Sequence, residues 1–552
     1  MKSNPTVAAV LAKDLAAFGA RRCFGLLGTA NFKISHALVE AGVELISARH
    51  EGNAASMADA YAKATQELTL VSVHSGPGLT NALTGIAEAA KSRTPLLVLA
   101  GDVPTGAVKS NFHIEQAEMV RSVGAVSERI HTPASAREDT LRAVTCAVRD
   151  RQTVVLSLPT DVQDAPFAGK IIPLALPPAP GLLHPAPASV RQLADALSSA
   201  ERPLILAGRG AVIAGAEQAL IALADHTGAL LANSICGHGL FAQHPWSVGI
   251  SGGFASPAAD ELISESDLII GFGVSLTHWT TKRGKLIAPG AVVAQIDVEA
   301  AKLGYQMPIN HAVHADARIT AEALLAEVSK RATRLRPEWR DDRTRQRIHD
   351  GANHHAPYQD TSSAEFIDPR TLSKAVDAIL PMERAVASDS GHFCGWVPRF
   401  LRVPDARASC LSHSFQSVGL GLASAIGLGV ANPGRLVVLG AGDGGFLMSI
   451  SDLETAIRLN LRMCILVYND SSYAAEVHLY RRRGYSIDIV QFPDTDFAAI
   501  ARGYGARATT VRTLADLDPV RTWVEEGAAG VFVIDGKINP DLEADWHAEH
   551  FP

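Results

Sequence analysis

The sequence predicts an α/β protein made of three doubly wound, parallel-sheet domains. Short apolar runs of strand length alternate with stretches whose apolar residues recur every three or four positions, as expected for strands joined by crossover helices. A chain of 552 residues is too long for a single hydrophobic core, since a domain averages about 150 residues. Two irregular stretches, the proline-rich 171–188 and the charged 331–367, divide the chain. We therefore expect domains at 1–170, 189–330 and 368–540.

Composition favours a protein of the cytoplasm. Apolar residues make up 47% of the chain and the formal net charge is -7, which argues against a nucleic-acid or membrane-surface role. Six cysteines are scattered without CxxC pairs and indicate reduced thiols, neither a zinc site nor a disulfide framework. The N-terminal segment continues as an amphipathic helix, so we expect no signal peptide and no membrane span.

The elements of the first domain follow in strict alternation. Helical periodicity covers 7–18, 32–40, 52–65 and 79–90, and strand-like runs cover 23–27, 45–48, 68–74 and 95–100. The second domain begins with a helix at 190–197 and a strand at 203–207. Such alternation places ligands at the carboxyl ends of parallel strands.

The third domain holds the stretch with the clearest chemistry. A strand at 436–439 leads into a glycine turn, then a helix carrying Phe446, Ile450, Leu453 and Ile457, then a strand at 463–468. The glycines of the turn free backbone N–H groups to bind phosphate; they are Gly442, Gly444 and Gly445.

An acidic pair accompanies this turn. Asp443 lies within the turn, where it would repel phosphate unless a cation lay between them. Asp470 follows the neighbouring strand and supplies a second carboxylate, and a backbone carbonyl near Ser472 is a third candidate ligand. These hard oxygen donors suit Mg²⁺. The alternative is an ordinary βαβ unit with a glycine turn.

The pattern GDG, helix, strand, Asn-Asp resembles the thiamine-diphosphate signature of the 2-oxoacid decarboxylase and acetohydroxyacid synthase superfamily. The resemblance implies thiamine diphosphate and Mg²⁺ as cofactors, with Asp443 and Asp470 as metal ligands. Many members carry Asn where this chain has Asp470, and the aspartate keeps an oxygen ligand while adding charge.

Glu51 lies at the end of a strand and begins the next helix. The context RHEGNAASMADAYAKAT resembles the superfamily stretch whose Glu hydrogen-bonds the aminopyrimidine N1′ atom and so promotes removal of the thiazolium C2 proton. Ala60 and Lys63 depart from the usual Gly and Arg. The alternative is a carboxylate that stabilises the helix dipole.

Further cofactor contacts are implied by the same resemblance. They are Gly76 and Asn81 in the turn HSGPGLTN, Gly391 and His392 in the turn SDSGH, Val418 as the apolar side chain between the two cofactor rings, and Tyr473 after the acidic pair. Without the cofactor, these turns are tight strand-to-helix connections and Val418 is a core valine.

Three residues are candidates for the reacting centre. His113 falls where relatives carry a Gln or His facing that centre, and the alternative is a solvated loop histidine. Glu476 resembles the Glu of pyruvate-type decarboxylases near the reacting carbon, and the alternative is a surface residue paired with Arg481. Asn31, in the first-strand turn, is a weaker candidate.

The middle domain carries Gly208-Arg209-Gly210-Ala211 after a strand. Its third glycine, Gly215, falls two residues later than the dinucleotide fingerprint requires, and no acidic residue ends the next strand. FAD or a nucleotide is therefore possible there but not required.

We expect an enzyme that cleaves or forms C–C bonds next to a carbonyl, by non-oxidative 2-oxoacid decarboxylation with acyloin carboligation. Alternatives are an acetolactate synthase-type transferase, a 2-hydroxyacyl or acyloin lyase, a flavin or nicotinamide oxidoreductase, and a catalytically silent homologue. The partners implied are small 2-oxoacids and aldehydes, and a second copy of the chain in a homodimer or homotetramer whose site lies between subunits.

Overall fold

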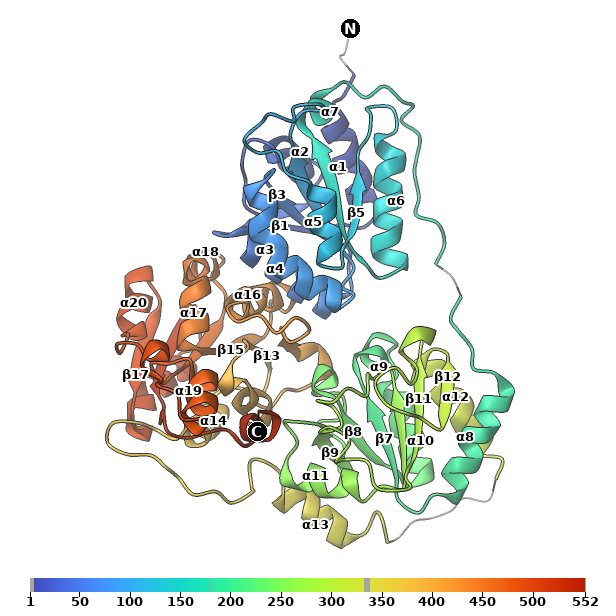
Figure 1. The fold of residues 1–552 in the computed structure, drawn as a ribbon, viewed down its shortest axis with the longest axis vertical. Coiled ribbons are helices and arrows are strands. Elements are labelled where there is room, and N and C mark those ends of the chain that lie inside the picture. The colour runs from blue at the N-terminus through green and yellow to red at the C-terminus, as the bar shows by residue number, and fades with distance from the viewer. Residues whose placement is uncertain (1–3, 180, 332–337, 552) are drawn as a thin grey trace.

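Three sheets of six parallel strands, each flanked by helices, make up the computed structural model, which describes residues 4–179, 181–331 and 338–551 (Figure 1). The predicted fold class is confirmed. Several central strands are buried along their whole length, among them β3 (Thr69–Val73) and β15 (Leu436–Gly442, apart from its last residue), as expected of sheets covered on both faces.

The N-terminal sheet has the strand order β2-β1-β3-β4-β6-β5. Its strands are β1 (Arg22–Gly25), β2 (Glu44–Ser47), β3, β4 (Leu96–Asp102), β5 (Val126–Arg129) and β6 (Thr153–Pro159). Its helices are α1 (Val7–Ala17), α2 (Phe32–Glu40), α3 (Glu51–Thr65), α4 (Pro77–Lys91), α5 (Gln116–Ser122), α6 (Ala136–Arg149) and α7 (Thr160–Asp164).

The middle sheet has the order β12-β11-β10-β7-β8-β9. Its strands are β7 (Pro203–Ala207), β8 (Leu230–Asn233), β9 (Ser247–Ile250), β10 (Leu268–Phe272), β11 (Val292–Asp297) and β12 (His311–His314). Its helices are α8 (Pro187–Ser199), α9 (Arg209–Ile213), α10 (Glu217–Thr227), η1 (Ile235–Gly237), α11 (Pro257–Ser264), η2 (Ala300–Lys302) and α12 (Ala317–Val328).

The C-terminal sheet has the order β14-β13-β15-β16-β18-β17. Its other strands are β13 (Arg384–Ser388), β14 (Ser409–Leu411), β16 (Met463–Asn469), β17 (Arg507–Val511) and β18 (Val531–Lys537). Its helices are α14 (Pro369–Ile379), η3 (His392–Gly395), α15 (Trp396–Phe400), η4 (Ala406–Ala408), α16 (Gly421–Ala431), α17 (Asp443–Ser449), η5 (Ile450–Asp452), α18 (Leu453–Arg458), α19 (Ala474–Arg482), η6 (Asp488–Val490), α20 (Phe497–Tyr504), η7 (Leu514–Leu517), α21 (Asp518–Glu525) and α22 (Asp545–His550).

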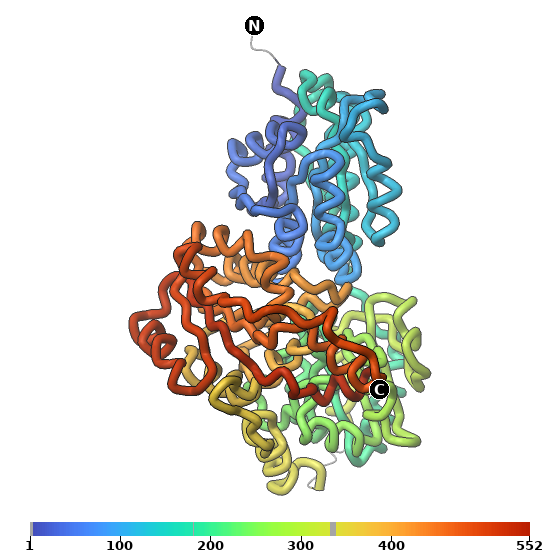
Figure 2. Tube along the Cα trace, turned by 60° about the vertical axis from the view of Figure 1, so that its left-hand side comes forward, coloured from blue at the N-terminus to red at the C-terminus, as the bar shows by residue number. Residues whose placement is uncertain are grey.

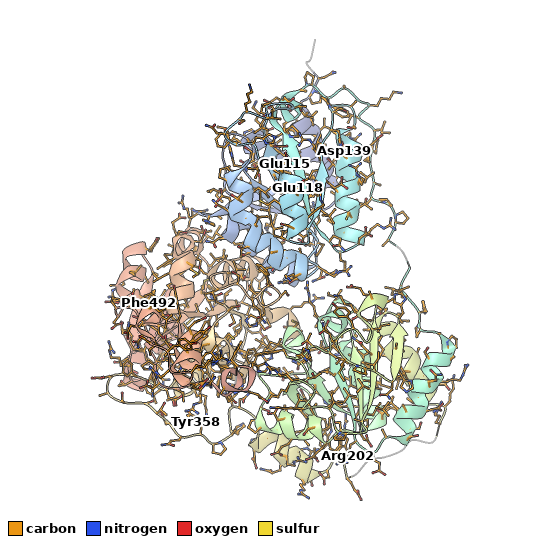
Figure 3. All side chains as sticks on the ribbon, in the orientation of Figure 1. Glu115, Glu118, Asp139, Arg202, Tyr358 and Phe492 are labelled. Atoms are coloured by element: carbon orange, nitrogen blue, oxygen red, sulfur yellow. The ribbon has the colours of Figure 1, made fainter. Side chains whose placement is uncertain are left out.

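The connections between domains differ in structure. The described residues of 167–186 form neither helix nor strand, in keeping with their prolines. The second connection contains α13 (Asp342–Asp350) and then an extended stretch that carries Tyr358, whose ring packs under Arg370 and Lys374 (Figure 3). In the ribbon and the tube view the N-terminal domain lies above the C-terminal domain, and the middle domain lies beside the latter (Figures 1 and 2).

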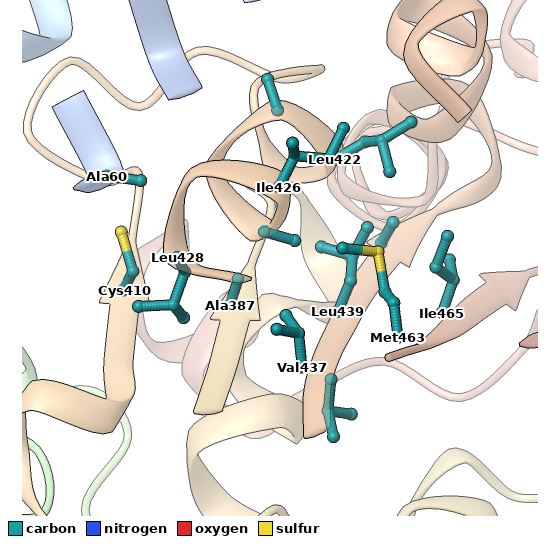
Figure 4. Packing of buried hydrophobic residues seen from close by; sticks show 14 of the residues in the cluster. Ala60, Ala387, Cys410, Leu422, Ile426, Leu428, Val437, Leu439, Met463 and Ile465 are labelled. Carbon is teal, nitrogen blue, oxygen red and sulfur yellow. The ribbon is translucent and has the colours of Figure 1, made fainter. Parts of the chain in front are cut away.

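The N-terminal and C-terminal domains share one apolar core. A single cluster of buried side chains runs from the inner face of the first sheet through α3 and α16 into the third sheet. Ala60 of α3 lies beside Cys410 and Leu428 of the C-terminal domain (Figure 4). The helices touch at Gly427, where an added Cβ atom would overlap the Met57 carbonyl oxygen.

A buried ionic network seals the same junction. The Lys63 ammonium lies 2.6 Å from Asp59 and 3.0 Å from Glu88. Glu88 also accepts hydrogen bonds from the backbone N–H groups of Ser414 (3.2 Å) and Phe415 (2.7 Å) of the C-terminal domain. Burial alone would raise the pKa of Glu88, but Lys63 and these two N–H groups hold it below its usual value. The carboxylate therefore stays ionised and joins the two domains.

The helix predicted to follow the glycine turn is not continuous. It divides into α17, the 3-10 turn η5 and α18. The turn points the fully buried Asp452 at α3, where it accepts hydrogen bonds from the Arg49 backbone N–H (2.9 Å) and the Asn53 side-chain amide (2.6 Å). A contact with a distant helix overrides the local 3.6-residue period.

Replacing Gly427 by Val should weaken the docking of α3 on α16. The overlapping atom is backbone and cannot move unless α3 moves, so we expect a loss of about 1–3 kcal/mol in stability and a lower Tm by circular dichroism. Gly434→Ala is the matched control, because no atom lies within 4 Å of its added Cβ. An unchanged Tm for Gly427→Val would contradict the close contact.

Candidate active site

The C-terminal sheet changes direction between β13 and β15, so the loops that follow these strands flank one crevice. The loop after β15 is the turn Gly442–Gly445, and the loop after β13 begins at Asp389. Asp389 is 1% exposed and accepts hydrogen bonds from the N–H groups of Ser390 (2.8 Å) and Gly419 (3.0 Å). A Cβ at Gly445 would overlap the Asp389 carboxylate, so glycine is what lets the two loops approach.

Asp443 and Asp470 lie at the ends of the adjacent strands β15 and β16. The Asp470 carboxylate accepts hydrogen bonds from the N–H (3.1 Å) and hydroxyl (2.9 Å) groups of Ser472. Burial raises the pKa of Asp443 to about 6. Burial, and then the negative charge of Asp443, raise that of Asp470 to about 8. Two half-buried carboxylates that repel each other are stabilised as anions by a cation between them.

The donor set fits the magnesium ion that the sequence implies. Carboxylate oxygens are the ligands Mg²⁺ prefers, and the ion usually keeps several further oxygen ligands from water or phosphate. Among the described residues, no group of three or more His, Cys, Asp or Glu side chains gathers as a metal site. The pair Asp443 and Asp470 therefore leaves coordination positions for a backbone carbonyl such as that of Ser472 and for phosphate oxygens.

Val418 and Tyr473 stand at the mouth of this crevice. Val418 is 41% exposed, and its Cγ1 would lie 3.1 Å from a Cβ added at Gly445, so its reading as a core valine is wrong. Tyr473 is 43% exposed, lies against Gly444 and packs edge-on against Phe492, with ring centroids 4.7 Å apart (Figure 3). Both apolar faces are therefore available to a ligand.

The N-terminal sheet changes direction between β1 and β3 and offers a second crevice. Glu51, the first residue of α3, is 7% exposed, and its Oε2 accepts a hydrogen bond from the Asn81 side-chain amide (3.1 Å). The turn between β3 and α4 starts at Gly76, whose φ of 61° favours glycine. Asn81 thus orients the carboxylate predicted to be catalytic.

Asn31 and His113 take different places near this crevice. The Asn31 amide is fully buried and bonds Gly28, Leu26 and Ser72, so it locks the loop after β1. His113 is half-buried in the loop after β4 and lines a cavity of about 260 Å³, which is also lined by Glu115 and Arg129 (Glu115 is labelled in Figure 3).

The His392 side chain points away from the glycine turn. Its Nε2 accepts the backbone N–H of Ala544 at 2.9 Å, and its ring lies 4.7 Å from that of His478 and 5.2 Å from that of His547. Burial, followed by these two histidines, holds the pKa of His392 well below its usual value, so the ring is neutral. The His392 ring is thus directed at the C-terminal segment, and its neighbour Gly391 has φ 143°.

Glu476 lies in the first turn of α19 and is exposed. Arg481, its expected surface partner, pairs instead with Asp541 at 3.0 Å. No hydrogen bond or ion pair of the Glu476 side chain is found among the described parts of the chain. The carboxylate is therefore free to meet a ligand or a second subunit.

In the described parts of one chain, the residues named for each crevice contact residues of their own domain. Glu51 bonds Asn81 of its own domain, and the glycine turn contacts Asp389, Phe393, Val418 and Tyr473 of its own domain. The two domains touch each other where α3 packs on α16, on the face of α3 that is opposite to Glu51.

The middle domain does not present an open dinucleotide crevice. Its sheet changes direction between β7 and β10, where a pyrophosphate would lie. Gly210 N–H donates to the Gly273 carbonyl oxygen at 2.9 Å, and a Cβ at Gly208 would overlap the same oxygen. The loops that would flank the ligand are thus packed on each other. This packing adds no support for an FAD or nucleotide site, which stays possible but is not required.

Two residues of structural importance escaped sequence reasoning. Asp389 ties the loop after β13 to the loop before α16, and Asp452 holds the two domains together. The turn SDSGH carried a signal for the first, because Asp often bonds the backbone of its own turn. Nothing local marked the second, whose partners lie about 400 positions away in the chain.

Comparison with known proteins gives matches along the chain. The N-terminal, central and C-terminal domain models of thiamine pyrophosphate enzymes match residues 5–122, 190–324 and 389–535. Relatives include a probable acetolactate synthase large subunit of Methanocaldococcus jannaschii, 27% identical over 91% of this chain and 87% of that protein. A sulfoacetaldehyde acetyltransferase of Castellaniella defragrans is 27% identical (92% and 88%), and a catabolic acetolactate synthase of Raoultella terrigena is 28% identical (98% and 96%).

No helix within the described ranges is long and apolar enough to cross a membrane. The three matched models follow the order of the three sheets, and two of them describe thiamine pyrophosphate-binding domains that contain Glu51 and the Asp443–Asp470 pair respectively. The chain belongs to the thiamine pyrophosphate enzyme family.

Proposed function

We propose that this protein is a Mg²⁺- and thiamine diphosphate-dependent enzyme that makes or breaks C–C bonds next to a carbonyl, by 2-oxoacid decarboxylation with carboligation. The observation that carries the proposal is the half-buried Asp443–Asp470 pair beside a glycine turn, at the crevice of one thiamine pyrophosphate-binding domain. The names of the relatives, acetolactate synthase and sulfoacetaldehyde acetyltransferase, favour ligation or acyl transfer as the fate of the fragment.

Each residue of the proposed site has a role of its own. When bound, thiamine diphosphate supplies a nucleophilic carbon and an electron sink for cleavage beside a carbonyl. Asp443 and Asp470 hold Mg²⁺, and the N–H groups of the turn Gly442–Gly445 bind phosphate oxygens. Glu51, oriented by Asn81, exchanges a proton with the aminopyrimidine N1′ atom.

The site is completed by a second copy of the chain. The rim of the C-terminal crevice exposes large apolar side chains, which are Val418, Leu447, Met448 and Tyr473, and the N-terminal crevice exposes Leu27, Phe32 and Phe112. Burying both sets in a homodimer removes apolar surface from water and brings Glu51 of one subunit to the magnesium site of the other.

Glu51→Gln and Asp443→Ala test both the chemistry and the assembly. Each variant alone should lose activity, Glu51→Gln by a factor of about 100 to 10,000 because the amide cannot exchange the proton. When the two inactive variants are mixed and allowed to reassociate, half of the dimers are mixed and each holds one intact site, so about a quarter of wild-type activity should return. No recovery in mixtures shown to exchange subunits would place the site within one chain.

The variants Asp443→Ala and Asp470→Asn should differ in their affinity for thiamine diphosphate. Asp443→Ala removes a ligand, so calorimetry should show weak binding of thiamine diphosphate that no longer responds to Mg²⁺. Asp470→Asn keeps an oxygen ligand and removes the repulsion between the two carboxylates, so binding should persist. Wild-type, Mg²⁺-dependent affinity in Asp443→Ala would remove this residue from the metal site.

Glu476→Gln tests the fate of the bound fragment. If Glu476 delivers a proton to it, the amide should slow aldehyde release more than carbon dioxide release and shift the product towards ligation. Both products are measured in one reaction, and Glu525→Gln, on α21, serves as a surface control. Equal loss of both products, or loss of neither, would return Glu476 to the surface and favour the synthase-type transferase.

A further inference from the structure

The turn between β2 and α3, which presents Glu51, is held on both sides by one carboxylate of the C-terminal domain. Asp452 Oδ1 accepts a hydrogen bond from the backbone N–H of Arg49 at 2.9 Å. Asp452 Oδ2 accepts one from the side-chain amide of Asn53 at 2.6 Å. Arg49 and Asn53 lie two residues before and two residues after Glu51. The carboxylate therefore brackets the residue that is proposed to act on the cofactor.

Asp452 is fixed in this place by its burial and by its donors. The side chain is fully buried, and its Oδ1 also accepts the Thr455 hydroxyl at 2.8 Å. Asp452 is the last residue of η5, the 3-10 turn that interrupts the helix after the glycine turn and directs the side chain at α3. A buried acceptor that loses a donor keeps the cost of its desolvation, so a shift of either segment is unfavourable.

Two further contacts join the same segments nearer the surface. The Arg49 guanidinium pairs with Glu454 at 2.7 Å, and Arg458 donates to the carbonyl oxygen of Ser47, the last residue of β2. The Arg49 side chain is 52% exposed, and an ion pair so open to solvent contributes little. The buried bonds of Asp452 are therefore the ones that hold the turn.

Contacts inside the N-terminal domain have a different effect on Glu51. The Asn81 amide donates to its Oε2 and so orients the carboxylate. His50 closes the first turn of α3 by accepting the Gly52 N–H at 3.1 Å. Asp452 adds bonds from outside the domain, on both sides of Glu51, and a shift of the first turn of α3 would break them.

We propose that Asp452 is a positioning residue, which holds the first turn of α3 so that the Glu51 carboxylate meets the cofactor at hydrogen-bond distance; this rests on the proposed function. Proton exchange requires heavy atoms about 2.6–3.2 Å apart. A displacement of about 1 Å can reduce a rate roughly a hundredfold. Asp452 is fully buried and touches neither substrate nor cofactor, so it acts through Glu51.

The test compares wild type, Asp452→Asn and the exchanged pair Asp452→Asn with Asn53→Asp, all loaded with thiamine diphosphate and Mg²⁺. The substrate is the 2-oxoacid or acyloin that wild type turns over fastest in a panel. Asparagine has one accepting oxygen where Asp452 has two, so a bond on one side of Glu51 is lost. We expect kcat to fall by a factor of about 10 to 100 with little change in KM. The exchanged pair re-forms an amide-to-carboxylate bond and should recover most of kcat.

Two comparisons separate positioning from stability. Lys63→Gln weakens the ionic network near the other end of α3, about 18 Å along the helix, so it should lower Tm and leave kcat at the wild-type value. In a Glu51→Gln background, Asp452→Asn should cause no further loss of kcat, because Asp452 acts through Glu51. If Asp452→Asn does not fold, Asn53→Ala, which removes the bond on one side, replaces it in both comparisons.

The outcomes distinguish the positioning role from the proposed function. Wild-type kcat in folded Asp452→Asn, or an equal loss of kcat with and without Glu51→Gln, would overturn the role of Asp452 alone. Recovery of Tm without recovery of kcat in the exchanged pair would assign Asp452 to stability only. Absence of cofactor-dependent turnover by wild type on the whole panel would overturn the proposed function and this role with it.

Discussion

The contact between α3 and α16 determines how the rest of the molecule is arranged. Because the helices touch at Gly427, with no side chain between them, the N-terminal domain is seated on the C-terminal domain in one orientation. Asp452 and the Lys63–Glu88 network add directional bonds around an otherwise apolar junction. With one face of α3 committed to this junction, the buried Glu51 at its first residue meets Asn81 of its own domain instead.

The electrostatics of the C-terminal crevice depend on three aspartates, Asp389, Asp443 and Asp470. Asp389 receives backbone N–H groups from two loops, and burial still raises its pKa to about 6. Asp443 also receives backbone N–H groups, and its negative charge adds to burial in raising the pKa of Asp470 to about 8. The pair Asp443 and Asp470 therefore differs from Asp389 in the repulsion between two neighbouring carboxylates, which a bound cation would relieve.

Local patterns were enough to predict the first four strands and four helices of the N-terminal domain, the first helix and strand of the middle domain, and the strands on either side of the glycine turn. Glu51 and Asp443 were found because a strand-to-helix boundary fixes where a side chain lies in a parallel sheet. The patterns failed where a distant partner decides the outcome. Asp452 interrupts a helix that its own segment favours, the His392 ring turns to the C-terminal segment, and Arg481 chooses Asp541 over Glu476. Each of these partners lies too far away in the sequence for a local pattern to indicate it.

The core shared by the first and third domains has a consequence for synthesis on the ribosome. The apolar face of α3 emerges early, but α16, which covers it, follows roughly 350 residues later, or about 20 to 70 s at usual elongation rates. The middle domain has apolar clusters of its own and can fold during that interval. The nascent N-terminal domain therefore waits with an uncovered apolar surface, which makes it a natural client for chaperones that bind emerging chains.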